Sequence, residues 1–311
     1  MPQPLQFPID EIRISQSVGR PVKSPIRVSS LRHLGIDQEQ FIATFAPFFQ
    51  DLPWDPYDVR RLQVDFLKQQ FAKEAQDIQA LFKAYYLGQI DLKSFDQWIE
   101  RLSSKQKAEF DQILPWRRRS VAQFLVEEKE QKVLITREAV KQFAQEVQGA
   151  DYRSLPRIFA EAPPEHVEND LFDQWIAQVF RITQEIRPEA RAIRMVAHFM
   201  GVKALPARPG DNSPEGAHED GADYIVSALV IKRENLVGGE SQIIEQLDNG
   251  QKEIIFQHEL QVGEFIFQGD SRDEIVHGTD LWHHVTPFRI ANPKLGEGWR
   301  DIIGFDINVI G

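Results

Sequence analysis

Residues 299–309, WRDIIGFDINV, alternate between two kinds of side chain along their length. The odd-numbered positions, from Trp299 to Val309, are mostly apolar, and the even-numbered positions are mostly polar or small. Because successive side chains of a strand point to opposite faces of a sheet, this pattern predicts a strand. Arg300 falls on the polar face together with Gly304, and we expect that face to line the interior of a barrel-like fold.

Further strands are expected upstream of this run. Short apolar stretches separated by Gly, Pro, Asn and Asp predict strands over residues 224–231, 242–247, 253–256 and 264–267. Asp248-Asn249-Gly250 lies between two of them and favours a hairpin, since Asn-Gly accepts the positive φ angles of a tight turn. Many short strands at regular spacing are typical of a sandwich or a jelly roll. We therefore expect a β-rich domain over residues 186–311.

The N-terminal part of the chain has a different pattern. From about residue 37 to residue 183 the apolar side chains recur at helical spacing. Asp37 followed by Gln40 favours a helix start, and Thr136 is expected to open another helix. We expect residues 1–185 to be mostly helical. The fold class is then α+β, with a helical half before a β-rich half.

Composition excludes several kinds of protein. The chain has 311 residues and no cysteine, which removes disulfides, iron–sulfur clusters and thiol nucleophiles. Its 36 basic and 47 acidic side chains give a net charge of −11, which disfavours a nucleic-acid partner. The first residues lack a signal-peptide pattern, and no run of about 18 apolar residues indicates a membrane span. We expect a cytoplasmic protein.

The residues that suggest chemistry are His218 and Asp220, within the stretch PEGAHEDG at residues 214–221. In extended chain, residues two apart point to the same side, so this imidazole and carboxylate can converge on one ion. Two His and one carboxylate leave open coordination positions, as in non-haem Fe(II) oxygenases. A third ligand must come from elsewhere, and the downstream candidates are His258, His277, His283 and His284.

Four motifs occur in a fixed order: the His-x-Asp pair, Gly238-Gly239-Glu240, His283-His284-Val285-Thr286-Pro287, and Arg300-Asp301. In this order they resemble the iron(II)- and 2-oxoglutarate-dependent dioxygenases of the family that includes bacterial L-isoleucine and L-leucine hydroxylases. The resemblance covers roughly residues 195–309, and the N-terminal half shows nothing comparable. It implies a double-stranded β-helix, a cupin-like jelly roll, with Fe(II) as cofactor and 2-oxoglutarate and O₂ as cosubstrates.

The resemblance also implies roles for individual residues. His218, Asp220 and His283 match the metal ligands; His284 would point to the opposite side of a strand, and His277 is a lesser alternative to His283. Arg300 matches the arginine that holds the far carboxylate of 2-oxoglutarate, to which a guanidinium can offer two parallel donors. Arg289, which also follows the distal histidine, is the alternative cosubstrate-binding residue.

The family suggests a small-molecule substrate, a free L-amino acid or a similar compound, hydroxylated at an aliphatic carbon. Such a ligand needs a partner for its carboxylate, for which Arg208 is a candidate, while Tyr224 and Glu219 are expected to line the entrance. The helical half would supply a lid or a homodimer surface. Two other functions stay open: a metal-binding or stress-response module without oxygenase activity, and a hydroxylase of a carrier- or protein-tethered residue.

Overall fold

The computed structural model describes residues 25–140, 155–247, 249–270 and 281–310. The chain divides into two compact units. The first comprises Met1–Leu52, Arg119–Val140 and Ala160–Gly311, and the second comprises Pro53–Arg118 and Lys141–Phe159. No helix of the described ranges is both long and apolar enough to cross a membrane.

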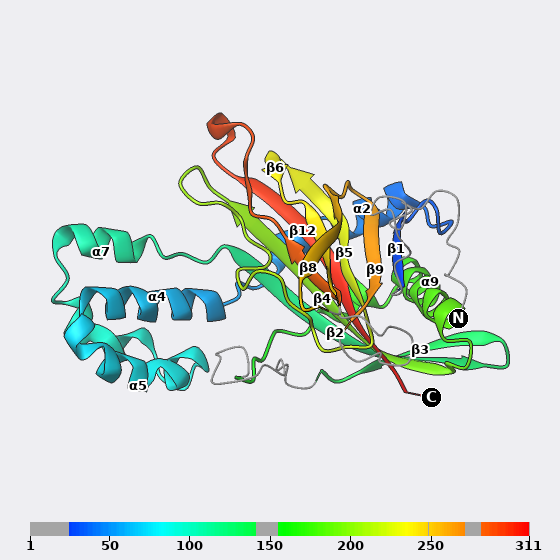
Figure 1. Cartoon of the computed structure of the whole chain (residues 1–311), viewed down its shortest axis with the longest axis horizontal. Helices are drawn as coiled ribbons and strands as arrows, with labels where there is room; N and C mark the ends of the chain where they lie inside the picture. Colours follow the sequence, from blue (N-terminus) through cyan, green and yellow to red (C-terminus); the bar gives the residue numbers. More distant parts are fainter. Residues whose placement is uncertain (1–24, 141–154, 248, 271–280, 311) are drawn as a thin grey trace. The chain divides into compact units, whose positions relative to one another are not determined.

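The first unit is built on a seven-stranded sheet in the order β1-β9-β5-β12-β4-β2-β3 (Figure 1). The expected C-terminal strand is confirmed as β12, which pairs antiparallel with β5 on one side and β4 on the other. The strands are β1 (Ile26–Ser30), β2 (Arg117–Lys129), β3 (Lys132–Glu138), β4 (Ala192–Ala204), β5 (Tyr224–Glu234), β9 (Glu264–Gly269) and β12 (Gly298–Val309).

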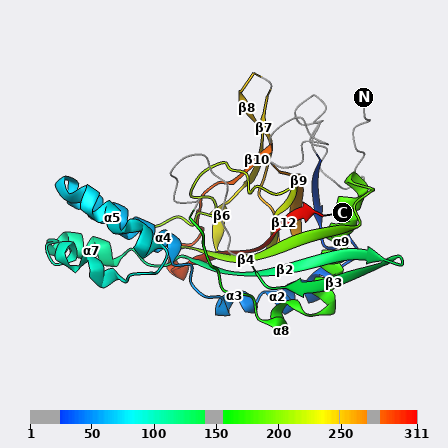
Figure 2. The same cartoon turned by 90° about the horizontal axis from the view of Figure 1, so that it is seen from below.

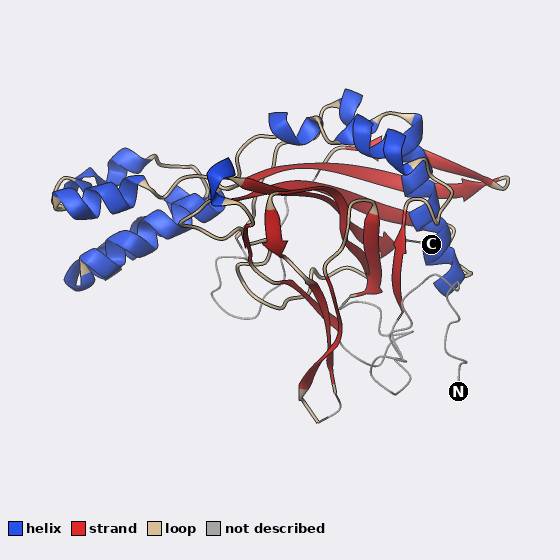
Figure 3. Cartoon of the chain, turned by 90° about the horizontal axis from the view of Figure 1, so that it is seen from above, coloured by secondary structure: helices blue, strands red, loops and turns tan. Residues whose placement is uncertain are grey.

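Two smaller sheets lie on one face of the large sheet (Figure 3). One has the order β10-β7-β8, with β10 at Leu281–Val285, β7 at Ser241–Gln246 and β8 at Lys252–His258. The other pairs β11 (Phe288–Ile290) with β6 (Leu236–Gly238). Along the chain, the strands pass from the large sheet to the smaller sheets and back more than once, which is consistent with a jelly roll.

Helices cover the other face of the large sheet (Figure 2). They are α2 (Gln38–Phe45), α3 (Phe48–Asp51), α8 (Pro164–Val167) and α9 (Asp170–Ile186). The side chain of Asn169 accepts a hydrogen bond from the Phe172 amide and so caps α9. The buried ring of Trp175 packs against Phe265 of β9 and Phe305 of β12, with centroids 4.9 and 5.8 Å away.

The two faces of β12 therefore have different neighbours, as the alternation predicts. Ile303, Phe305 and Ile307 belong to the core cluster under the helices. Ile302 belongs to a second cluster, shared with residues of β7 and β10, between the large and small sheets. Arg300 has the parity of Ile302, so its side chain lies on the face toward the smaller sheets.

The second unit is helical and has a core of its own. It contains α4 (Tyr57–Gln70), α5 (Ala75–Tyr86), α6 (Asp96–Ile99), α7 (Ser104–Asp111) and two short 3₁₀ turns, η1 (Ala72–Glu74) and η2 (Leu92–Phe95). Ser103 and Gln106 form a reciprocal capping box at the start of α7. The core residues come from several of these helices and include Val64, Leu67, Ile78, Phe95, Trp98 and Phe110.

The helical character of the N-terminal half is confirmed in outline, with one correction. Thr136 does not open a helix, because it lies in β3 opposite Leu125 of β2. The turn joining the two strands is Glu130-Gln131, and both residues have positive φ, +51° and +64°. Two such angles define the type I′ turn of a tight hairpin, which usually contains Asn or Gly. Neither residue is present, so the sequence carries no hairpin signal here.

Candidate metal centre

The backbone brings His218 and His283 together although 65 positions separate their numbers. The N–H of each residue donates to the carbonyl of the other, both at 3.0 Å, in an isolated antiparallel bridge. His218 lies in the segment that leads into β5, and His283 lies in β10. The two imidazole centroids are 4.2 Å apart as a result.

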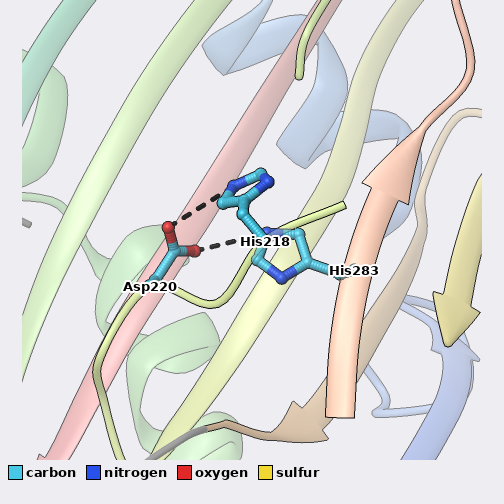
Figure 4. Close-up of side chains that lie close together, drawn as sticks. All are labelled: His218, Asp220 and His283. Carbon is cyan, nitrogen blue, oxygen red and sulfur yellow. Dashed lines mark ion pairs between the residues drawn. The ribbon is translucent and has the colours of Figure 1, made fainter. Parts of the chain in front are cut away.

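Asp220 completes the group (Figure 4). Its Oδ1 lies 3.6 Å from Nε2 of His218, and its Oδ2 lies 3.4 Å from Nε2 of His283. One ligand atom from each of the three residues falls within 4.8 Å of the others. Two imidazole nitrogens and one carboxylate oxygen thus face a common point, which is the donor set of a divalent transition-metal site.

The other predicted ligands lie elsewhere. Nδ1 of His284 is 3.0 Å from Oε1 of Gln242, and Nε2 of His258 is 3.2 Å from Oε2 of Glu264. Neither belongs to the group of three. His277 lies outside the described residues.

Hydrogen bonds and charges prepare the imidazoles for an ion. Nδ1 of His218 is 3.0 Å from the carbonyl of Gly216, to which it can only donate, so Nε2, facing Asp220, is the ring nitrogen left for an ion. Burial lowers the pKa of His283 to about 3, helped by the positive charge of His218, so this ring is neutral at pH 7. Burial opposes the charged form of His218, but the carboxylates of Asp220 and Glu215 outweigh it and raise its pKa.

Asp220 keeps its negative charge. Burial alone would raise its pKa, but the neighbouring His283 and His218 lower it below the usual value. The buried Nδ1 of His283 has no hydrogen-bond partner in the described part of the chain. A neutral imidazole, a second imidazole and an ionised carboxylate around one point fit a divalent ion.

Arg300 is a buried cation on the face of β12 that is directed toward the smaller sheets, one of which contains the His283 strand, β10. It is fully buried, and its Nη1 donates to Oδ1 of Asn212 at 3.2 Å. Its Nε and Nη2 have no hydrogen-bond partner among the described residues. Burial, followed by the charge of Arg233, lowers the pKa of Arg300 to about 9, which still leaves it charged at neutral pH. A buried guanidinium with two unused donors fits a carboxylate ligand.

Arg208 and Arg289 lie together in another place. Both line a cavity of about 220 Å³ whose wall also contains Leu205, Pro206 and Pro209. None of His218, Asp220, His283 or Arg300 lines this cavity. Arg208 and Arg289 are close in the chain to Gly210 and Phe288, whose isolated bridge is separate from the one between His218 and His283.

The remaining predicted residues differ in position. Glu219 lies between the two ligands in the chain and is half-buried. Tyr224 is fully buried, and its ring stacks on Phe267 at 5.5 Å within the core under the helices. The structure therefore brings Glu219 beside the ligands, whereas Tyr224 lies in the helix-facing core.

Three polar side chains, Arg119, His198 and Asp306, are linked by hydrogen bonds, and none of them was predicted from the sequence as a site residue. His198, twenty positions before His218, contacts Arg119 Nη2 through Nδ1 at 3.0 Å and Asp306 Oδ2 through Nε2 at 2.9 Å. Arginine can only donate, so Nδ1 must accept and Nε2 must carry the proton that it donates to Asp306. The alternation of residues 299–309 places Asp306 on the same face as Arg300 and could have indicated it.

Asp270 follows β9 directly, and no motif or spacing in the sequence indicates that it belongs to the site. Burial raises its pKa to about 7, and the nearby charge of Asp220 adds to this effect. It accepts hydrogen bonds from the segment that carries Asp220. Only the long-range pairing of β9 with β5 brings it there.

Comparison with known proteins gives one family and several structures. A family model described as "2OG-Fe dioxygenase" matches residues 103–306, more than half of the chain. No curated protein matches the sequence. The structure of a bsmA homolog from Methylobium petroleophilum PM1 is 16% identical, with a TM-score of 0.54 over 95% of this chain and 85% of that chain, and so shows a shared fold.

Two further solved structures are less similar. IDO from Bacillus thuringiensis is 17% identical with a TM-score of 0.48, covering 63% of this chain and 79% of its own. The Fe(II)/α-ketoglutarate-dependent dioxygenase TqaL is 12% identical with a TM-score of 0.43, covering 81% of this chain and 90% of its own.

Proposed function

The chain belongs to the 2OG-Fe dioxygenase family, and from this premise we propose that it hydroxylates a free L-amino acid or a similarly small molecule at an aliphatic carbon. The family uses Fe(II), 2-oxoglutarate and O₂. In the proposed reaction one oxygen atom of O₂ enters the substrate as a hydroxyl and the other enters succinate, while 2-oxoglutarate loses CO₂. The observation that carries the proposal is the convergence of His218, Asp220 and His283.

We assign the iron to these three side chains. When bound, Fe(II) supplies the redox chemistry that couples decarboxylation of 2-oxoglutarate to oxidation of a C–H bond. The protein's part is to hold the ion through three ligands on one side, which leaves positions on the other side open to the reactants. The bond from His218 to the Gly216 carbonyl keeps Nε2 available for the ion.

We assign the far carboxylate of 2-oxoglutarate to Arg300. Its two unused donors are buried, so an anion there would satisfy them in a site that excludes water. Arg289 is the alternative, but it is exposed on β11 and lines the separate cavity with Arg208. The burial and unused donors of Arg300 favour it over Arg289.

Substrate recognition is the less constrained part of the proposal. Glu219 lies between His218 and Asp220 in the chain, and its carboxylate is suited to bind an ammonium group of the substrate. Arg208 and Tyr224 stay predicted substrate contacts. Tyr224 is the weaker candidate of the two, because its ring stacks on Phe267 in the core. We also propose that residues 186–311 supply most strands of a double-stranded β-helix, to whose large sheet the mostly helical region 1–185 adds β1, β2 and β3.

Two measurements test the function. Anaerobic addition of Fe(II) and 2-oxoglutarate should give a weak visible charge-transfer band with the wild-type protein, and succinate release should then be assayed against the twenty amino acids. His218→Ala and Asp220→Ala should abolish the band and turnover but leave the circular dichroism spectrum unchanged. His284→Ala is the matched control, because it removes the adjacent imidazole that lies outside the group of three.

The outcomes separate the alternatives. A wild-type protein that binds metal but gives neither the band nor succinate would be a binding module. Uncoupled succinate release with no amino acid accepted would transfer the proposal to a carrier- or protein-tethered residue. Loss of the band in His284→Ala but not in His218→Ala would refute the ligand assignment.

A further inference from the structure

Asp270 occupies a fixed position at the end of β9. It is 5% exposed, and its own N–H donates to the carbonyl of Asp223 at 3.0 Å. This bond continues the antiparallel pairing of β9 with β5, in which Gly269 lies opposite Tyr224. The backbone of the large sheet thus determines where the Asp270 carboxylate lies.

That carboxylate binds three consecutive backbone amides of the ligand segment. Oδ2 accepts from the N–H of Gly221 at 2.7 Å and of Ala222 at 2.8 Å. The N–H of Asp220 lies 3.2 Å from Oδ2 and 3.3 Å from Oδ1. Gly221 has a φ of +85°, a turn conformation in which successive amides point to one side and form an anion-binding nest.

The flanks of this turn are fixed by other bonds. On one side His218 is paired with His283 through the backbone. On the other side the N–H of Asp223 donates to the carbonyl of Ile307 at 3.1 Å, and its carboxylate accepts from the N–H of Val309 at 2.7 Å. The amides of Asp220, Gly221 and Ala222 lie between these anchors, and each donates to the carboxylate of Asp270.

We propose that Asp270 is a positioning residue of the metal centre: by binding these three amides it fixes the Asp220 backbone and so holds the Asp220 carboxylate against both imidazoles. The inference rests on the proposed function only in taking Asp220 as a metal ligand. Asp270 itself is not among the three residues whose ligand atoms converge. Outer partners of this kind typically change metal affinity by about ten- to a hundredfold when they are removed.

The test is Mn(II) binding to the metal-free full-length protein, followed by calorimetry or electron paramagnetic resonance. Asp270→Asn keeps the shape of the side chain but replaces one acceptor oxygen with an NH₂ group that cannot accept from an amide. We expect its Kd for Mn(II) to rise about ten- to a hundredfold, with a native circular dichroism spectrum. Asp270→Ala should weaken binding at least as much.

Asp55→Asn is the matched control. Asp55 is also a buried carboxylate that accepts a backbone N–H, from Tyr57 at 2.9 Å, but it lies in the helical unit. Its substitution should lower the melting temperature and leave the Kd for Mn(II) within about twofold of the wild type. A purely structural role for Asp270 would give the same result as this control, and that result would overturn the proposal.

Hydrogen exchange on the wild-type protein gives a test that needs no variant. The amides of Asp220, Gly221 and Ala222 should exchange slowly in the metal-free protein, because each donates to a buried carboxylate. Exchange at the rate of an exposed loop would overturn the inference even if Asp270→Asn failed to fold. A wild-type protein that binds no Mn(II) would instead overturn the metal assignment itself, which separates the two failures.

Discussion

Arg300 illustrates how much of the site depends on single side chains. The N–H groups of a fully buried guanidinium normally all have hydrogen-bond acceptors. Nε and Nη2 of Arg300 have none among the residues that the structure describes. Its position on the inner face could be predicted from the alternation of residues 299–309, whereas its hydrogen bond to Asn212 could not. Asn212 and Arg300 are 88 positions apart in the chain, so only the three-dimensional fold brings them into contact.

Arg300→Gln is therefore expected to raise the KM for 2-oxoglutarate by about ten- to a hundredfold, since each charge-assisted hydrogen bond contributes about 1.5–3 kcal/mol. The Kd for Mn(II) should not change, because Arg300 is not among the ligands. Steady-state succinate release and Mn(II) titration check these two expectations. Arg289→Gln is the control, and if it alone raised the KM, the cosubstrate would have to be assigned to Arg289.

At the scale of the element, a strand or turn could be predicted only where the local sequence has the pattern typical of it. The sequence predicts β12 because one face of this strand, from Trp299 to Val309, is mostly apolar. The β2–β3 hairpin was missed because Glu130-Gln131 adopts positive φ angles without Asn or Gly. The centre required the pairing of His218 with β10, which no local pattern encodes.

Helix α9 packs on the large sheet through the ring of Trp175. Trp175→Ala removes a fully buried ring between Phe265 and Phe305, so we expect the free energy of unfolding to fall by about 3–5 kcal/mol. Urea denaturation of the full chain measures it. Gln174→Ala, at the adjacent exposed position, should change it by less than about 0.5 kcal/mol. Equal effects of the two substitutions would contradict the packing described for α9.

The helical unit contains an acid-sensitive contact. Hydrogen bonds from Arg101 and then from Trp98 lower the pKa of Glu74 from 4.5 to about 2. A depressed pKa contributes stability that is complete above about pH 4.5 and is lost as the pH falls toward 2. Glu74→Gln should thus be less stable than the wild type at pH 6, and the difference should shrink below pH 4.5.

Thermal unfolding of both proteins between pH 6 and pH 2.5 checks this dependence. Glu100→Gln is the control, because Glu100 is an exposed carboxylate of the same unit. A difference between wild type and Glu74→Gln that stays constant across this pH range would show that the carboxylate charge is not responsible.

At the scale of the whole molecule, the two units have separate cores, and all three proposed ligands belong to the first. The spacing of apolar residues and of short strands was enough to predict a helical part and a jelly-roll-like part. They were not enough to predict that β1, β2 and β3, from the N-terminal half, extend the large sheet. Strand order is a property of long-range pairing, which a single sequence does not contain.

Metal binding should stabilise the first unit by mass action. With Mn(II) at about 100 times its Kd, the native state should gain about 2.7 kcal/mol, and the melting temperature of the wild-type protein should rise. Asp220→Ala should show no such rise, which scanning calorimetry with and without Mn(II) can establish. A rise of equal size in Asp220→Ala would mean that the ion binds elsewhere.

The backbone bridge between His218 and His283 also bears on which ion the protein carries. Main-chain hydrogen bonds, which do not depend on an ion, make the two imidazoles neighbours, so the pair should need little rearrangement to bind one. A rigid set of two nitrogens and one oxygen does not discriminate among divalent metals, and copper, nickel and zinc rank above iron in the Irving–Williams series. Selection for iron then depends on supply, and protein purified from zinc-rich medium is expected to contain zinc in place of iron.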